Sequence, residues 1–248
     1  MASAQNQPWE MDQLRIACAF YFTLPFGRMH KSNPEIVHLA GLLGRTPSSL
    51  AMKLAQFASL DPEHRARGIR GLSNAGRMDN IVWTEFQSNW ADSLLASQVA
   101  RDQILNPIDR PTEDIRPTKI RLEQATFRKI VLAAYSSQCC ITGNPVPELL
   151  IASHILPWSE HPDQRLDPRN GLCLSAEFDK AFDNHLISFD EQFKLLINPK
   201  LKRHKSSAYI SEHILNREGT EMRLPERFTP EPAYMAQHRQ LWLADGSS

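Results

Sequence analysis

The chain has 248 residues with 28 basic and 28 acidic side chains, so its formal net charge is zero. This length fits one large domain or two small ones, and any nucleic-acid binding must rely on local positive charge. The sequence has no apolar run near the ~20 residues of a membrane span and no N-terminal secretory signal, so we expect no membrane partner and a cytoplasmic location.

The N-terminal residues predict a series of helices. Apolar residues recur at helical spacing over 11–20. Asn33 and Pro34 have the residue types of an N-cap and a first helical position, and Gly44 has that of a helix stop. Thr46 and Pro47 repeat the start signal for a third helix.

The second and third predicted helices, joined by a tight turn, are the ingredients of a helix-turn-helix. In that interpretation the residues that contact DNA are Arg45, Ser48, Ser49 and Lys53. The alternative is a plain helical bundle with a solvated basic face.

A proline-rich segment with alternating charges follows, over 106–117. It indicates a boundary, so we expect a helical domain over 1–105, a linker over 106–120 and a second domain over 121–248. The second domain is predicted to open with a helix from about Leu122 to Tyr135.

Four cysteines are present: Cys18, Cys139, Cys140 and Cys173. Adjacent cysteines do not form a compact disulfide easily, and no CxxC pair exists. We expect reduced, buried thiols, with a mixed Cys/His zinc site as the alternative.

After Tyr135 the pattern changes to strands and a short helix. An apolar run over 149–152 predicts a strand that delivers His154 to its end. A polar loop leads to Asn170, and Ser175 is the predicted N-cap of a helix that runs through Ala181. Two paired strands are predicted over 186–190 and 193–197.

These residue types suit phosphodiester hydrolysis. A histidine of ordinary pKa can take a proton from water, and helix carboxylates four residues apart, Asp179 and Asp183, can hold Mg²⁺. An asparagine amide can hold a loop or orient the imidazole. Each residue alone is more often structural, so the prediction depends on their order and spacing.

The motifs Ser153-His154-Ile155-Leu156-Pro157-Trp158, Asn170-Gly171-Leu172-Cys173-Leu174 and Phe178-Asp179-Lys180-Ala181-Phe182-Asp183 together resemble the HNH (ββα-metal) endonucleases, in their restriction-endonuclease branch. In some of those proteins a helical domain precedes the nuclease and is similar to residues 43–53. The resemblance implies an α+β fold, with an N-terminal helical, helix-turn-helix-like domain followed by a ββα-metal nuclease domain.

The resemblance also implies roles. His154 takes the place of the general base, Asn170 that of the residue that orients it, and Asp179 that of a metal ligand. Asp183 is either a second ligand or structural. Many family members have an Asp or His directly before the base, where this chain has Ser153, a poorer ligand.

The carboxylates favour Mg²⁺, or Mn²⁺, over zinc. Arg128 and Lys180 are further candidates for DNA contact, and His185, where the family usually has Gly, is interpreted as a bystander. The expected function is therefore a metal-dependent DNA endonuclease in restriction or anti-phage defence.

A homodimer would let two such sites cut both strands. The alternatives are a non-catalytic DNA-binding regulator on an HNH scaffold, a structural or protein-interaction module, and a nuclease that acts on RNA.

Overall fold

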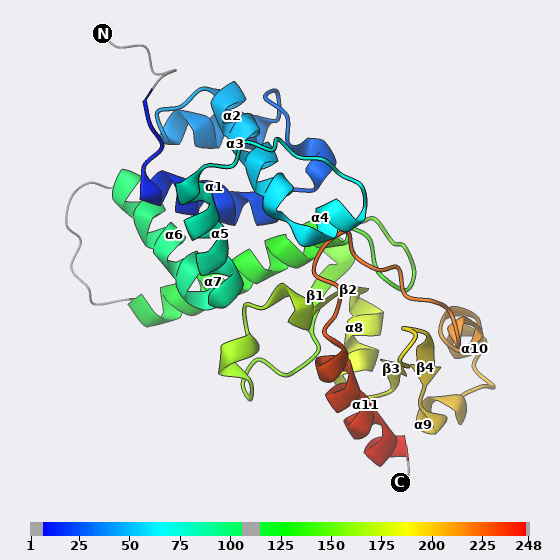
Figure 1. Ribbon diagram of the computed structural model, residues 1–248. Coiled ribbons are helices and arrows are strands. Elements are labelled where there is room, and N and C mark those ends of the chain that lie inside the picture. The colour runs from blue at the N-terminus through cyan, green and yellow to red at the C-terminus, as the bar shows by residue number, and fades with distance from the viewer. Residues whose placement is uncertain (1–6, 106–114, 247–248) are drawn as a thin grey trace. The chain divides into compact units, whose positions relative to one another are not determined.

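The computed structural model describes the backbone of residues 7–105 and 115–246, and the side chains of 7–105 and 123–246 (Figure 1). The chain divides into two units, residues 1–126 and 127–248, and each is considered by itself. Helices form the first unit, and helices with short antiparallel strands form the second, so the fold class is α+β as predicted. Within the described residues, no helix is long and apolar enough to cross a membrane.

Most of the predicted linker, residues 106–114, lies outside the described residues. The helix expected from about Leu122 begins seven residues earlier, because α7 spans Ile115–Ala134. Pro117 therefore lies in its first turn, where a proline is tolerated because the first N–H groups of a helix have no partner within it.

The first unit is built on α1, which packs against three other helices, α3, α5 and α6. Its core contains the fully buried aromatic side chains of Tyr21, Phe22, Phe57 and Phe86. The helices of this unit are α1 (Met11–Phe22), α2 (Pro34–Leu42), α3 (Pro47–Leu60), α4 (Pro62–Ala66), α5 (Arg77–Ser88) and α6 (Trp90–Leu105).

The predicted starts of the second and third helices and the predicted stop at Gly44 are confirmed. The Asn33 side chain accepts a hydrogen bond from the Glu35 amide at the start of α2, and the Thr46 hydroxyl accepts one from the Ser49 amide at the start of α3. Gly44 has a positive φ of 63°, the conformation that ends a helix.

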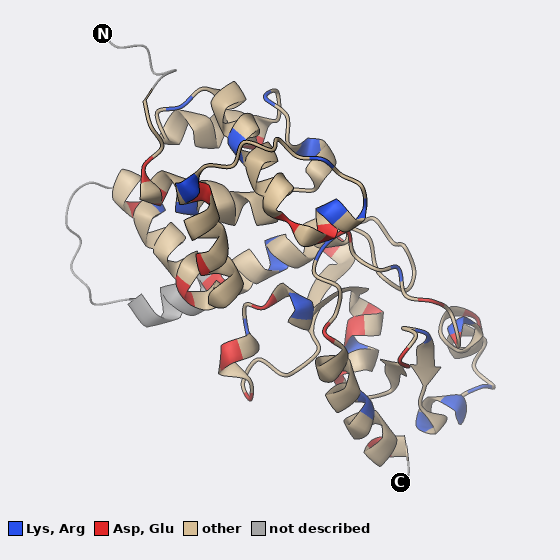
Figure 2. Ribbon diagram, viewed as in Figure 1, with Lys and Arg blue, Asp and Glu red and all other residues tan. Residues whose placement is uncertain are grey.

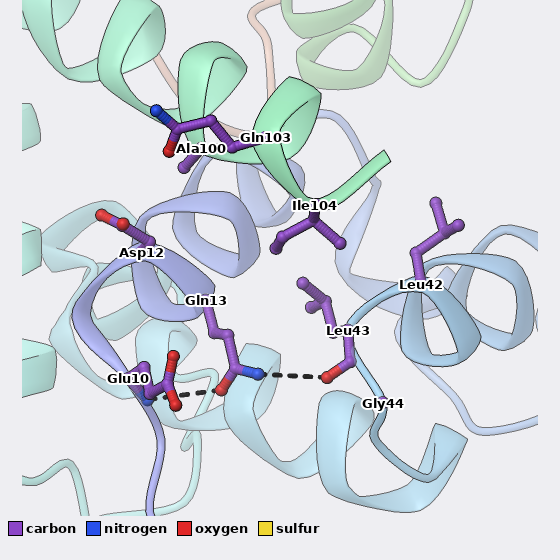
Figure 3. A pocket seen from close by; sticks show the side chains of 9 residues that line it. All are labelled: Glu10, Asp12, Gln13, Leu42, Leu43, Gly44, Ala100, Gln103 and Ile104. Atoms are coloured by element: carbon purple, nitrogen blue, oxygen red, sulfur yellow. Dashed lines mark hydrogen bonds between the residues drawn. The ribbon is translucent and has the colours of Figure 1, made fainter. Parts of the chain in front are cut away.

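One pocket of the first unit, of about 350 Å³, lies between the start of α1, the end of α2 and the end of α6 (Figure 3). The Gln13 amide inside it donates to the Leu43 carbonyl and accepts from the Glu10 amide. None of the nine residues that line it is His, Cys, Lys or Arg. None of the predicted catalytic residues lines this pocket.

The second unit contains a strand–strand–helix motif that holds those residues. Strands β1 (Leu150–His154) and β2 (Gly171–Ser175) pair antiparallel, and α8 (Ala176–Asp183) follows directly and packs on both. The remaining elements are β3 (Ile187–Phe189) and β4 (Leu195–Ile197), which form the second predicted hairpin, with α9 (Pro199–Lys202), α10 (Ala208–His213) and α11 (Pro232–Gly246).

Two details of this motif differ from, or add to, the prediction. Ser175 occupies the N-cap position of α8, but its hydroxyl lies 3.1 Å from the Thr142 hydroxyl instead of capping the helix. The thiol of Cys139 accepts hydrogen bonds from the Ser175 and Thr142 amides. All four cysteines are free and buried, as predicted.

Candidate active site around His154

His154 is the last residue of β1 and pairs with Gly171 of β2. Its Nε2 lies 3.0 Å from the backbone carbonyl oxygen of Arg165. Because a carbonyl only accepts, Nε2 carries the hydrogen of the neutral ring and donates it, which leaves the lone pair on Nδ1. The site therefore presents Nδ1 as the basic atom.

Aromatic side chains surround this imidazole. The Phe127 ring of α7 stacks on it with centroids 3.9 Å apart and planes within 11° of parallel, and Trp158 meets it edge-on at 5.2 Å. Burial lowers the pKa of His154 below its ordinary value, against the opposing effect of the hydrogen bond to Arg165. His154 is consequently neutral, and competent as a base, at neutral pH.

The loop between β1 and β2 closes around the base. Arg165, whose carbonyl accepts from His154, donates through Nε to the Trp158 carbonyl at 3.0 Å. Its guanidinium also lies over the Trp158 ring, 5.3 Å from the centroid. Three residues thus form a closed ring of contacts that fixes the orientation of the imidazole.

Asn170 holds the two ends of that loop together from a fully buried position. Its Oδ1 accepts from the Leu156 amide at 2.8 Å, and its Nδ2 lies within hydrogen-bond distance of the Leu156 and Gln164 carbonyls. These contacts fix the backbone on both sides of the base, next to the Arg165 carbonyl. Asn170 therefore acts on His154 through the loop.

A second network fastens the same loop to the C-terminal segment. Asp167 accepts from Arg169, at 2.8 Å for the shortest pair, and from the Tyr234 hydroxyl at 3.3 Å. Arg169 also pairs with Glu231 at 3.4 Å. The roles of these four residues, and of Phe127 and Arg165, were not predicted. The contacts of Glu231 and Tyr234 cross 62 and 67 residues, and a contact of that span leaves no local pattern.

The predicted metal ligands Asp179 and Asp183 lie on α8 and interact electrostatically. Burial first, and then the negative charge of Asp179, raise the pKa of Asp183, while Lys180 and His185 oppose the shift. Two carboxylates that repel each other in this way would be stabilised by a divalent cation, for which they are suitable ligands. The residues that contact His154 lie elsewhere: Phe127 is on α7, and Trp158 and Arg165 are in the loop between β1 and β2.

Ser153, the third predicted ligand, is 2% exposed, and its hydroxyl has no hydrogen-bond partner among the described residues. It points to the opposite face of β1 from His154, because side chains alternate along a strand. No group of three or more His, Cys, Asp or Glu side chains in the described part of the chain is arranged to hold a metal. The predicted ligands offer oxygen donors, which are the kind that Mg²⁺ takes together with waters.

The residues predicted to bind DNA differ in their surroundings. Arg45 is 8% exposed and donates to the Gln7 and Pro8 carbonyls, and Lys53 is 8% exposed and paired with Asp79 at 2.8 Å. Both cations are held inside the first unit, so they are not presented to a phosphate backbone.

Of the other predicted contacts, Ser48 is exposed and Ser49 half-buried. Arg128 donates to the Leu150 and Pro147 carbonyls and so fixes the start of β1. Lys180 is exposed on α8, between the two carboxylates in sequence.

Comparison with protein families identifies the segment that contains this site. Residues 139–190 match the family described as HNH endonuclease, and the matched segment includes β1, β2, α8 and β3. This match agrees with the resemblance to HNH endonucleases that the motifs of the same segment show. No curated protein matches the chain.

Proposed function

We propose that this protein is a metal-dependent endonuclease that hydrolyses DNA phosphodiester bonds, with His154 as the general base. The observation that carries the proposal is the hydrogen bond from His154 Nε2 to the Arg165 carbonyl, which leaves Nδ1 free to accept a proton. The family match to HNH endonucleases supports the reaction class.

In the proposed reaction, Nδ1 of His154 takes a proton from a water molecule while that oxygen attacks phosphorus in line. The bond between phosphorus and the 3′-oxygen breaks, which leaves a 5′-phosphate, and the departing oxygen takes a proton from solvent. The Arg165 carbonyl stabilises the imidazolium that forms, because its negative end faces Nε2–H. Phe127 and Trp158 keep the ring in place during the transfer.

A divalent cation, Mg²⁺ or Mn²⁺, would supply charge neutralisation at the phosphate and the leaving oxygen. Asp179 is the proposed first ligand and Asp183 the second, since the two carboxylates interact on α8. The buried Ser153 hydroxyl is a weaker third candidate. Oxygen donors of this kind favour such hard ions over zinc.

Plasmid nicking with Mg²⁺ or Mn²⁺ tests the proposal. We expect His154→Ala to lower the cleavage rate by about 100-fold or more while the protein stays folded, because a general base contributes about that much. His161→Ala, in the same loop, is the matched control and should cut at the parent rate. A folded His154→Ala protein that cuts as fast as the parent would contradict the assignment.

The same assay separates the alternatives. A non-catalytic regulator would shift DNA on a gel but never nick it, and an interaction module would do neither. Cleavage of RNA but not DNA would move the proposal to the other substrate. We further propose the division into a helical domain over 1–105, a linker over 106–120 and a nuclease domain over 121–248.

A role in restriction or defence, with a homodimer that cuts both strands, is the finer form of this proposal. Its test is cleavage of modified and unmodified plasmids followed by end mapping, together with the molecular mass in solution. Equal cutting of both plasmids by a monomer would contradict it.

A further inference from the structure

A basic stretch of the second unit takes no part in the site described above. Residues 194–205 contain five cations and no Asp or Glu. We call these cations the basic strip: Lys194, Lys200, Lys202, Arg203 and Lys205. Figure 2 shows the cations of α9 as adjacent blue segments of ribbon. Acidic residues slightly outnumber basic ones in the unit as a whole, so positive charge is concentrated here.

The side chains of the strip are available to a ligand. Lys194, Lys202, Arg203 and Lys205 are exposed, and Lys200 is half-buried. Lys202 pairs with Glu218 at 2.5 Å, with both side chains 45% exposed, and Lys200 lies 3.9 Å from Asp245. Exposed ion pairs of this kind are weak, so a phosphate can displace the carboxylate.

Asn198 ties the start of α9, which carries part of the strip, to the segment that follows α8. This fully buried residue caps α9 by accepting from the Lys200 amide, and its own amide nitrogen donates to the His185 carbonyl at 3.2 Å. The Asn198 backbone N–H donates to the Leu186 carbonyl. The start of α9 is thereby tied to the two residues that closely follow Asp183, the last residue of α8.

We propose that the basic strip binds the phosphate backbone of duplex DNA beside the carboxylates of α8. This inference rests on the proposed function and adds to it the surface that holds the substrate. A protein without net charge needs such a local concentration of cations to bind a polyanion. Because the contacts are to phosphates, the strip contributes affinity and no sequence preference.

The test measures binding of a DNA duplex by fluorescence anisotropy over a range of salt concentrations, in the full-length His154→Ala protein so that the DNA is not cut. Arg203→Gln with Lys205→Gln should weaken binding about tenfold or more. It should also reduce the slope of log K against log salt by about 1.8, since each lost phosphate contact removes about 0.9. Lys31→Gln with Lys129→Gln, which removes two exposed cations elsewhere, is the matched control.

For a third variant we expect the opposite effect on DNA binding. Glu218→Gln removes the carboxylate that holds Lys202 and should tighten binding and steepen the salt slope. If the strip is only a solvated face, DNA affinity and its salt dependence should not change in any variant.

Affinities and slopes equal to the control in both Arg203→Gln/Lys205→Gln and Glu218→Gln overturn the proposal. So does a lack of DNA binding by the His154→Ala protein. The parent protein, tested for plasmid nicking in parallel, shows separately whether the proposed function holds.

Discussion

Phe127 lies flat against the imidazole of His154, and this contact joins helix α7 to the end of β1. The contact depends on Gly171, which pairs with His154 across the hairpin. A Cβ at Gly171 would lie 2.9 Å from the Phe127 ring and 2.5 Å from a Val131 methyl group. The glycine after Asn170 therefore lets α7 come close enough to support the base.

Phe127→Leu should impair catalysis more than binding. Leucine keeps apolar bulk but not the flat ring face, so the imidazole loses its support and becomes better hydrated. Burial lowers the His154 pKa, so better hydration should raise it toward its ordinary value. We expect kcat to fall about tenfold, by loss of orientation, and the acid limb of the kcat–pH profile to move to higher pH.

Ile130→Val on the same helix is the control for this substitution, because it also costs about 1 kcal/mol of packing in a buried position. Its pH profile should match that of the parent. An unchanged profile in Phe127→Leu as well would show that the ring serves packing alone.

Gly171→Ala should destabilise the second unit by about 1–3 kcal/mol, the usual cost of overpacking. The added methyl group must displace a Val131 methyl group and the Phe127 ring. Val131→Ala removes the closer obstacle, so the double variant should be less destabilised than the sum of the single ones. A urea-denaturation cycle measures this coupling, and strict additivity would refute the proposed clash.

Lys53→Met should destabilise the first unit by about 3–5 kcal/mol and leave DNA affinity unchanged. The substitution leaves the carboxylate of Asp79, which is 2% exposed, without its cation. Asp79→Asn in the Lys53→Met background should restore part of the lost stability, because it removes the unpaired charge. The side-chain oxygen of the new asparagine can still accept the hydrogen bond that the Gly76 amide donates to Asp79. Chemical denaturation and DNA titration check the two parts. Weaker DNA binding by a folded Lys53→Met protein would restore the helix-turn-helix interpretation.

The features that could be predicted from sequence are local ones. Asn33, Thr46 and Gly44 mark helix ends because a cap needs partners only two or three residues away. The strand that ends at His154 and the hairpin of β3 and β4 were predicted from short apolar runs and the turns between them. Strand β2, by contrast, was expected only from the resemblance to ββα-metal nucleases.

The features that could not be predicted depend on distant partners. The sequence shows that Arg45 and Lys53 are cations, but not that their partners lie 38 and 26 residues away and bury them. The Arg128 guanidinium is likewise used on carbonyls at the start of β1. A charge pattern is therefore a useful guide to a DNA surface only where the charges stay exposed, as four of the five cations in 194–205 do.

Acid should destabilise the second unit through His238, which lies on α11 with 3% exposure. Its ring stacks on Phe182, its Nε2 donates to the Phe182 carbonyl, and its Nδ1 accepts from the Ser188 hydroxyl. Burial lowers the pKa of His238 to about 4, so the folded state prefers the neutral ring.

The unfolded chain binds the proton with a pKa of about 6.5, so this contribution to stability is complete above that pH. It is lost as the pH falls from about 6.5 to about 4, by about 3 kcal/mol in total. In His238→Gln this part of the pH dependence should disappear, because an amide does not titrate. The free energy of unfolding, measured between pH 4 and 7 for both proteins, checks this, and parallel curves would show that other groups cause the loss.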